Sequence, residues 1–100
     1  MKIKLKEFIG KDGKKRDQVF EIQEMDLGIY YDLTTALTMG HITLSQLAEP
    51  VLKDCIVSPE EAKKIDYFEN HPKALDTILG QIRGLLGEGV TKAPQVEIIE

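Results

Sequence analysis

The stretch that decides the fold runs Thr43-Leu-Ser-Gln-Leu-Ala-Glu-Pro-Val-Leu-Lys-Asp-Cys55. Thr43 and Gln46 have the spacing of a capping box, in which two side chains satisfy the free backbone N–H groups of a first helical turn. Pro50 removes one backbone donor without disturbing the apolar spacing, so we expect one kinked helix or two short helices that share a face. Apolar residues recur at helical spacing at Leu44, Leu47, Ala48, Val51, Leu52 and Cys55.

The segment after this stretch has the signals of a second, short helix. Ser58 is expected to cap it, Pro59 to occupy its first position and Glu61 to complete the box. We expect this helix to end near residues 66–68, where Tyr67 and Phe68 would hold the following loop against the core.

A longer amphipathic helix is expected to begin at Asn70-His-Pro72 and to run to Gly87. Its apolar stripe is wide and consists of Leu75, Ile78, Leu79, Ile82, Leu85 and Leu86. On a helical wheel Gly80, Gly84 and Gly87 lie together on the opposite side. Each interior glycine costs roughly 1 kcal/mol relative to alanine. The glycines therefore indicate either a marginal helix held by its apolar face or a contact face for another chain, with Arg83 beside it.

Upstream of Thr43 the pattern predicts one more helix and a hairpin. Residues 25–39 form the helix, which ends at Gly40. Residues 1–23 begin and end with strand-forming residues, and a polar turn that contains glycine lies between them. This pattern predicts a β-hairpin. The apolar stripe of the helix consists of Ile29, Leu33, Ala36 and Leu37, with Tyr30 widening it.

These elements predict a mainly α protein with a short N-terminal β-hairpin, a small α+β fold of about four helices packed on one core. One hundred residues suffice for one domain. We assign residues 1–89 to a single helical domain, with the hairpin in residues 1–23. Residues 90–100 form a C-terminal tail that either adds a strand beside the hairpin or is flexible, and their terminal position favours flexibility.

The charges are divided unevenly along the chain. Residues 1–16 hold seven Lys or Arg and two acids, whereas residues 17–52 hold no Lys or Arg. Residues 1–16 thus form a basic head, and residues 17–100 form an acidic body. This polarity suits self-association of the head of one chain with the body of another, or binding of an acidic partner. A solvated turn beside a solvated helical face explains the polarity as well. The candidates for electrostatic contact in the hairpin turn are Lys11, Lys14, Lys15 and Arg16. Nucleic acid is an unlikely partner because the helix after Thr43 lacks the basic residues that bind phosphates.

The sequence offers little material for catalysis. His41 and His71 stand at helix junctions, and the periodicity points the thiol of Cys55 into the core. A single cysteine allows no internal disulfide and no multi-cysteine zinc site. We therefore predict no enzyme activity, no catalytic or metal site and no cofactor. No apolar run is long enough for a membrane span, so a cytoplasmic location is expected.

The segment from Leu47 to Glu61 resembles the tail assembly chaperones of long-tailed phages and prophages. The resemblance rests on Leu52-Lys-Asp-Cys-Ile-Val-Ser-Pro59, on the aromatic step Asp66-Tyr-Phe68, on the closing amphipathic helix of residues 70–87 and on the lysine-rich opening strands. It implies a non-catalytic chaperone in the cytoplasm of the host cell that is absent from the mature virion. Its implied partners are the tape measure protein, which it covers, and the major tail protein, which it recruits.

Two alternatives remain open beside this resemblance. The first is a small phage or prophage regulator or inhibitor that binds a host protein through acidic residues of the segment 17–100. The second is a nucleic-acid-associated module that uses the basic hairpin.

Overall fold

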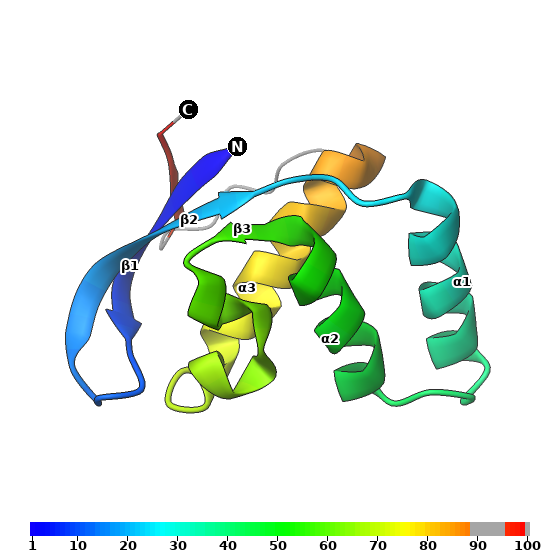
Figure 1. Ribbon diagram of the computed structural model, residues 1–100, viewed down its shortest axis with the longest axis horizontal. Coiled ribbons are helices and arrows are strands. Elements are labelled where there is room, and N and C mark those ends of the chain that lie inside the picture. Colours follow the sequence, from blue (N-terminus) through cyan, green and yellow to red (C-terminus); the bar gives the residue numbers. More distant parts are fainter. Residues whose placement is uncertain (89–95, 100) are drawn as a thin grey trace.

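The computed structural model describes residues 1–88 and 96–99 and shows a small α+β domain (Figure 1). Strands β1 (Lys2–Ile9) and β2 (Lys15–Ile22) form the predicted N-terminal hairpin. Their register pairs Ile3 with Phe20 and is shifted between Leu5 and Phe8. The helices are α1 (Leu27–Thr38), α2 (Leu44–Cys55) and α3 (Pro72–Arg83).

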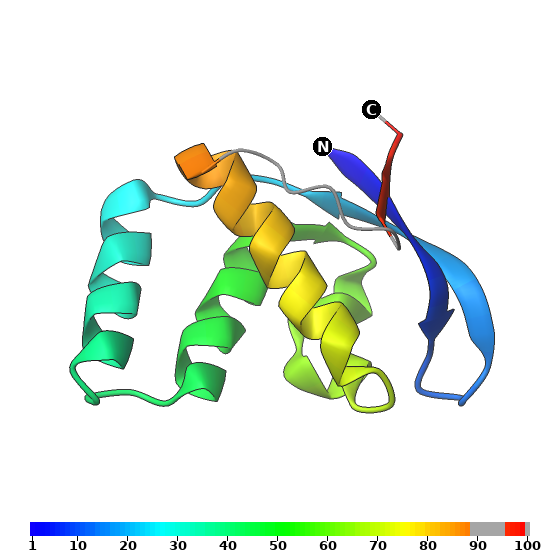
Figure 2. The same ribbon diagram turned by 180° about the vertical axis from the view of Figure 1, so that it is seen from behind.

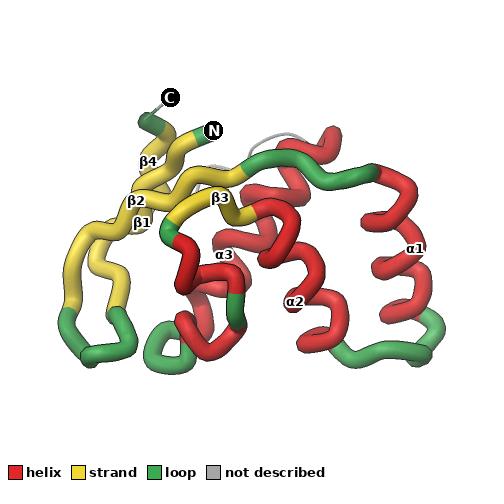
Figure 3. The backbone as a smooth tube through the Cα atoms, in the orientation of Figure 1, coloured by secondary structure: helices red, strands yellow, loops and turns green. Residues whose placement is uncertain are grey.

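The prediction of a mainly α fold with about four helices is wrong. Within the described part of the chain there are three α-helices and a four-stranded antiparallel sheet in the order β3-β2-β1-β4. Two short strands, β3 (Ile56–Ser58) and β4 (Val96–Ile98), widen the hairpin on its two sides (Figure 3).

Strand β3 forms in place of the expected start of a helix. Ile22 pairs with Ile56, and the N–H of Gln23 donates to the carbonyl of Cys55 at 2.8 Å. The edge of β2 thus offers backbone hydrogen bonds to a β-branched segment, which suits a strand. Ser58 pairs with Glu21 in the sheet and does not cap a helix.

Residues 60–68 form two 3₁₀ turns instead of the predicted short α-helix. The turns span Glu60–Lys63 and Ile65–Phe68, and Lys64 between them is extended. Pro59 follows a cis peptide bond and stands before the first turn, where no side chain caps the free N–H groups.

The predicted signals at the ends of α1 and α2 are present. The capping box forms with both bonds, one from the Thr43 N–H to Gln46 Oε1 at 2.8 Å and one from the Gln46 N–H to Thr43 Oγ1 at 3.2 Å. Helix α2 continues through Pro50 as one element. Gly40 ends α1 with a φ of +79°, and the N–H of His41 reaches back to the carbonyl of Ala36 at 2.8 Å, as in a Schellman motif.

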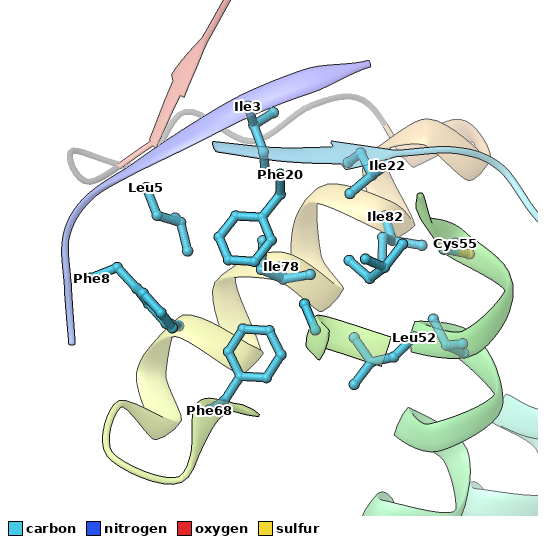
Figure 4. Packing of buried hydrophobic residues seen from close by; sticks show 14 of the residues in the cluster. Ile3, Leu5, Phe8, Phe20, Ile22, Leu52, Cys55, Phe68, Ile78 and Ile82 are labelled. Carbon is cyan, nitrogen blue, oxygen red and sulfur yellow. The ribbon is translucent and has the colours of Figure 1, made fainter. Parts of the chain in front are cut away.

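One apolar core lies between the sheet and α2, α3 and the 3₁₀ turns (Figure 4). Phe8 and Phe20 meet edge to face with their ring centroids 5.8 Å apart. Phe68 stacks on Phe20 at 6.0 Å and is 1% exposed, so the predicted anchoring of its loop is confirmed. Cys55 is fully buried in the same core, as the periodicity of its helix predicts.

The chain changes its winding after α3. Residues Gly84–Glu88 form a π-helical turn, and β4 then pairs with β1 in antiparallel register, with Ile98 opposite Ile3. Residues 96–98 therefore add a strand beside the hairpin, the first of the two alternatives for the tail. The rest of the predicted tail, residues 90–95 and 100, lies outside the described residues. No helix in the described part of the chain is long and apolar enough to cross a bilayer.

Candidate functional site

Helix α1 stands at one end of the long axis of the molecule, with α2 as the helix beside it (Figures 1 and 2). The sequence of α1 is rich in apolar residues, yet Tyr30 is its one buried side chain. Leu27 is 44% exposed, Ile29 49% and Tyr31 59%. A helix of this composition ordinarily buries a continuous stripe, whereas α1 has apolar side chains that the described part of the chain leaves exposed.

Two more exposed apolar side chains flank the turn between α1 and α2. Met39 follows the last turn of α1, and Leu44 opens α2, and both are exposed. We name the set Leu27, Ile29, Tyr31, Met39 and Leu44 the α1 surface; within it Leu27 and Tyr31, four residues apart, share one side of α1, and Ile29 lies on another side. Scattered exposed apolar residues are ordinary, whereas a concentration of them on one element is typical of an interaction site.

The position of Tyr30 explains why Ile29 does not face the core as predicted. The Nε of Arg83 at the end of α3 donates to the Tyr30 hydroxyl at 3.2 Å. The inner side of α1 therefore carries Tyr30, Leu33 and Leu37, and the last two are partly buried. A one-residue step turns an α-helix by about 100°, so Ile29 lies well away from the direction of Tyr30.

The structure does not bring the three glycines of the predicted contact face onto one open surface. Gly80 is half-buried, and a Cβ built on it meets no heavy atom within 4 Å. Gly84 is buried and begins the π-helical turn, where the helical wheel no longer applies. Gly87 lies in the same turn, and its exposure is outside what the structure describes. Arg83, also assigned to this face, holds α1 through Tyr30.

The four basic residues of the hairpin turn differ in their surroundings. Lys11 Nζ pairs with Asp66 Oδ2 at 3.1 Å and ties the turn to the second 3₁₀ segment, and Arg16 pairs with Asp12. The backbone N–H of Lys14, followed by the Arg16 guanidinium, holds the pKa of the Asp12 carboxyl below its usual range. Lys14 and Lys15 are exposed. Half of the predicted basic cluster is thus engaged with acids of the same chain.

The basic hairpin turn lies far from helix α1 in the folded molecule. The molecule measures 37 × 26 × 22 Å along its principal axes, and the hairpin turn and α1 lie at opposite ends of its longest axis (Figure 1). The basic residues of the turn are therefore far from the α1 surface.

An open groove of about 1200 Å³ runs between α2 and the 3₁₀ turns. Pro50, Ile65 and Tyr67 give it some apolar lining, and burial is the main cause that raises the pKa of the Tyr67 hydroxyl. Its other lining residues are Lys11, Lys53, Lys63, Lys64, Glu49, Glu60, Glu61 and Asp66. This even mixture of signs does not single out a charged ligand.

Cys55 and His71, two of the residues that the sequence analysis considered for catalysis, have structural contacts. Burial, with a smaller contribution from Asp54, raises the pKa of the Cys55 thiol to about 11, so the thiol is protonated at neutral pH. The ring of His71 stacks on Phe8, and its Nδ1 accepts the N–H of Ile9 at 3.1 Å. Among the residues that the structure describes, no group of three His, Cys, Asp or Glu could hold a metal ion.

The sequence analysis did not predict the α1 surface because it assigned one apolar stripe to this helix and did not consider the apolar residues outside that stripe. The signal is nevertheless in the sequence. Five large apolar residues occur within seven positions, which is more than one face of a helix can hold. They are Leu27, Ile29, Tyr30, Tyr31 and Leu33.

Comparisons of the chain with protein-family models, with curated proteins and with solved structures find no match.

Proposed function

We propose that this chain is a protein-binding chaperone of phage tail assembly that acts without catalysis and docks its partner on the α1 surface. The observation that carries the proposal is the exposure of Leu27, Ile29 and Tyr31 on an apolar helix. Removal of apolar area from water contributes roughly 25 cal/mol per Å² to protein association, before the entropy lost on binding is subtracted. A partner that covers these side chains therefore gains free energy that this fold by itself leaves unused.

The identity of the partner follows from the resemblance in residues 47–61. A tape measure protein is long and helical, and its apolar stripes need a cover until the tail tube encloses them. Within the α1 surface, Leu27 and Tyr31 have the four-residue spacing of a row on one side of a helix, and helices pair through such rows of interlocking side chains. Recruitment of major tail protein and a place in the host cytoplasm, outside the mature virion, belong to the same proposal.

The test is affinity capture from cells that produce the phage tail proteins, followed by mass spectrometry. The wild-type chain is compared with a variant carrying Leu27→Ser, Ile29→Ser and Tyr31→Ser. The matched control carries Val19→Ser and Val57→Ser, which lie in the sheet and are similarly exposed, at 40% and 39%. Circular dichroism on all three proteins checks that each is folded.

We expect the wild type and the control to capture a very long helical protein together with major tail protein, and the α1 variant to lose both. Equal capture by the α1 variant would refute the docking surface. Capture of one host enzyme instead would favour the regulator or inhibitor. Recovery of nuclease-sensitive nucleic acid would favour the basic hairpin.

A further inference from the structure

The turn of the N-terminal hairpin is held by the loop that precedes α3 (Figure 1). The side-chain amide of Asn70 donates to the carbonyls of Gly10 and Lys11 at 3.0 and 3.1 Å. Nδ1 of the next residue, His71, accepts the N–H of Ile9 at 3.1 Å. Two neighbouring side chains of the loop thus hold three consecutive residues of the hairpin.

The N–H of Ile9 has its acceptor in His71 and not in the sheet. The N–H of the next residue, Gly10, donates to the carbonyl of Lys14 on the other arm of the hairpin. Hydrogen bonds of an antiparallel pair alternate along each strand, so the N–H of Ile9 points away from β2. On that side β4 pairs with residues 3–5 and does not reach Ile9. Within the described part of the chain, the imidazole therefore takes the place of a missing strand.

This hydrogen bond requires a neutral imidazole. A neutral ring has one nitrogen that accepts and one that donates, whereas both nitrogens of a protonated ring donate. A proton on Nδ1 of His71 would set two N–H groups against each other, with their nitrogens 3.1 Å apart. The ring also stacks on Phe8, with the centroids 5.6 Å apart, which fixes its orientation towards Ile9. His71 is in addition the N-cap of α3, and the N-terminal end of a helix disfavours positive charge.

Charged and titratable groups of both signs lie on the elements that pack against His71. Lys11 Nζ pairs with Asp66 Oδ2 at 3.1 Å across the same contact. No ion pair joins the imidazole to a carboxylate among the described residues, so a protonated ring has no acidic partner in this arrangement. The groups next to the contact along each element are Glu7, Lys11, Asp66, Tyr67, Glu69 and Lys73.

We infer that His71 makes the attachment of the hairpin turn sensitive to pH, because the neutral ring holds the turn and protonation releases it. The contribution of the bond is complete above the range in which histidine titrates and is lost as the pH falls through that range. Phe8 and Phe20 stay in the core, so the release is confined to the turn. Helix α1 lies at the opposite end of the long axis (Figure 1), so the release is independent of docking on the α1 surface.

NMR spectroscopy of the full chain between about pH 7.5 and about pH 5 tests the release, in a range where most carboxylates stay charged. The nitrogen chemical shifts of the imidazole report which nitrogen carries the proton. Hydrogen exchange of the Ile9 amide, relative to an unstructured peptide at the same pH, reports the bond itself. We expect the proton of His71 on Nε2 at the upper pH. As the ring titrates, the protection of Ile9 should fall about tenfold, which corresponds to the loss of one hydrogen bond.

The second histidine of the chain supplies a matched control. His71→Asn removes the titrating ring and retains a good N-cap residue, and the Ile9 amide should then be equally unprotected at both ends of the pH range. His41→Asn removes an exposed histidine that stands after α1, at the other end of the molecule. This variant should lose protection at Ile9 as the wild type does.

Constant protection of Ile9 while His71 titrates would overturn the inference, as would a proton on Nδ1 at the upper pH. A pH-dependent loss that persists in His71→Asn would assign the release to another group. Simultaneous loss of protection at Ile3 and Phe20, which pair in the sheet, would show global unfolding in place of local release. If His71→Asn does not fold, the match between the Ile9 amide and the ring titration in the wild type still decides.

Discussion

Alanine placed at Gly80 or at Gly40 should change the stability of the protein in opposite directions. At both positions a built Cβ meets no heavy atom within 4 Å, so crowding plays no part. The positions differ in their backbone. Gly80 is in the interior of α3, whereas Gly40 has a φ of +79° at the end of α1.

The magnitudes follow from this difference. Gly80→Ala should raise the free energy of unfolding by about 1 kcal/mol, the difference in helix propensity between the two residues. Gly40→Ala forces an L-residue into left-handed backbone at a cost of roughly 1–2 kcal/mol. Reduced freedom of the unfolded chain offsets about 0.4–1 kcal/mol of that cost, so a net loss of about 1 kcal/mol remains.

Thermal unfolding followed by circular dichroism measures both changes, since 1 kcal/mol corresponds to a shift in Tm of about 4–8 °C for a domain of this size. Urea unfolding with unchanged m-values is the check that only stability has changed. Shifts of the same sign in the two variants would refute the reasoning. Destabilisation by Gly80→Ala would mean that the space beside Gly80 is filled in solution, as a glycine contact face between chains would require.

Three further measurements test the core, the thiol and the charged hairpin. Phe68→Ala removes a ring that is 1% exposed and should lower the free energy of unfolding in urea by about 3–5 kcal/mol. Tyr31→Ala, at a side chain that is 59% exposed, should change it by less than about 0.5 kcal/mol. Equal effects would contradict the placement of the core. The pKa of the Cys55 thiol is raised from 9.0 to about 11, so its contribution to the free energy of unfolding is complete below pH 9 and is lost as the pH rises towards 11. The expected slope is near 1.4 kcal/mol per pH unit, and Cys55→Ala should remove it. An identical slope in that variant would assign the loss to other groups. If the basic hairpin mediates self-association, the mass in sedimentation should fall with added salt and with Lys14→Gln and Lys15→Gln, whereas a monomer at low salt would exclude it.

The local features of the fold were readable from the sequence because each depends on residues close together in the chain. The capping box at Thr43 and Gln46, the end of α1 at Gly40 and the hairpin before residue 23 all formed as predicted. The burial of Cys55 also followed from helical spacing alone. These features are governed by backbone hydrogen bonds within a turn and by periodic apolar faces.

The signals at residues 56–61 show where local reasoning fails. Ser58, Pro59 and Glu61 have the spacing of a helix start, but the edge of β2 is close by in space and pairs with Ile56 and Ser58. The free energy of that pairing depends on residues more than thirty positions away, which no local pattern contains. Tertiary context overrides propensity in such segments.

The sequence by itself determined the hairpin, the three long helical segments and the separation of charge along the chain. The tertiary structure decided that four strands of the described chain form one sheet and that Tyr30, held by Arg83, occupies the inner side of α1. It also decided that Leu27, Ile29 and Tyr31 remain exposed. The physical reason is that periodicity identifies which side chains can be buried, whereas the space available beside each helix determines which of them are.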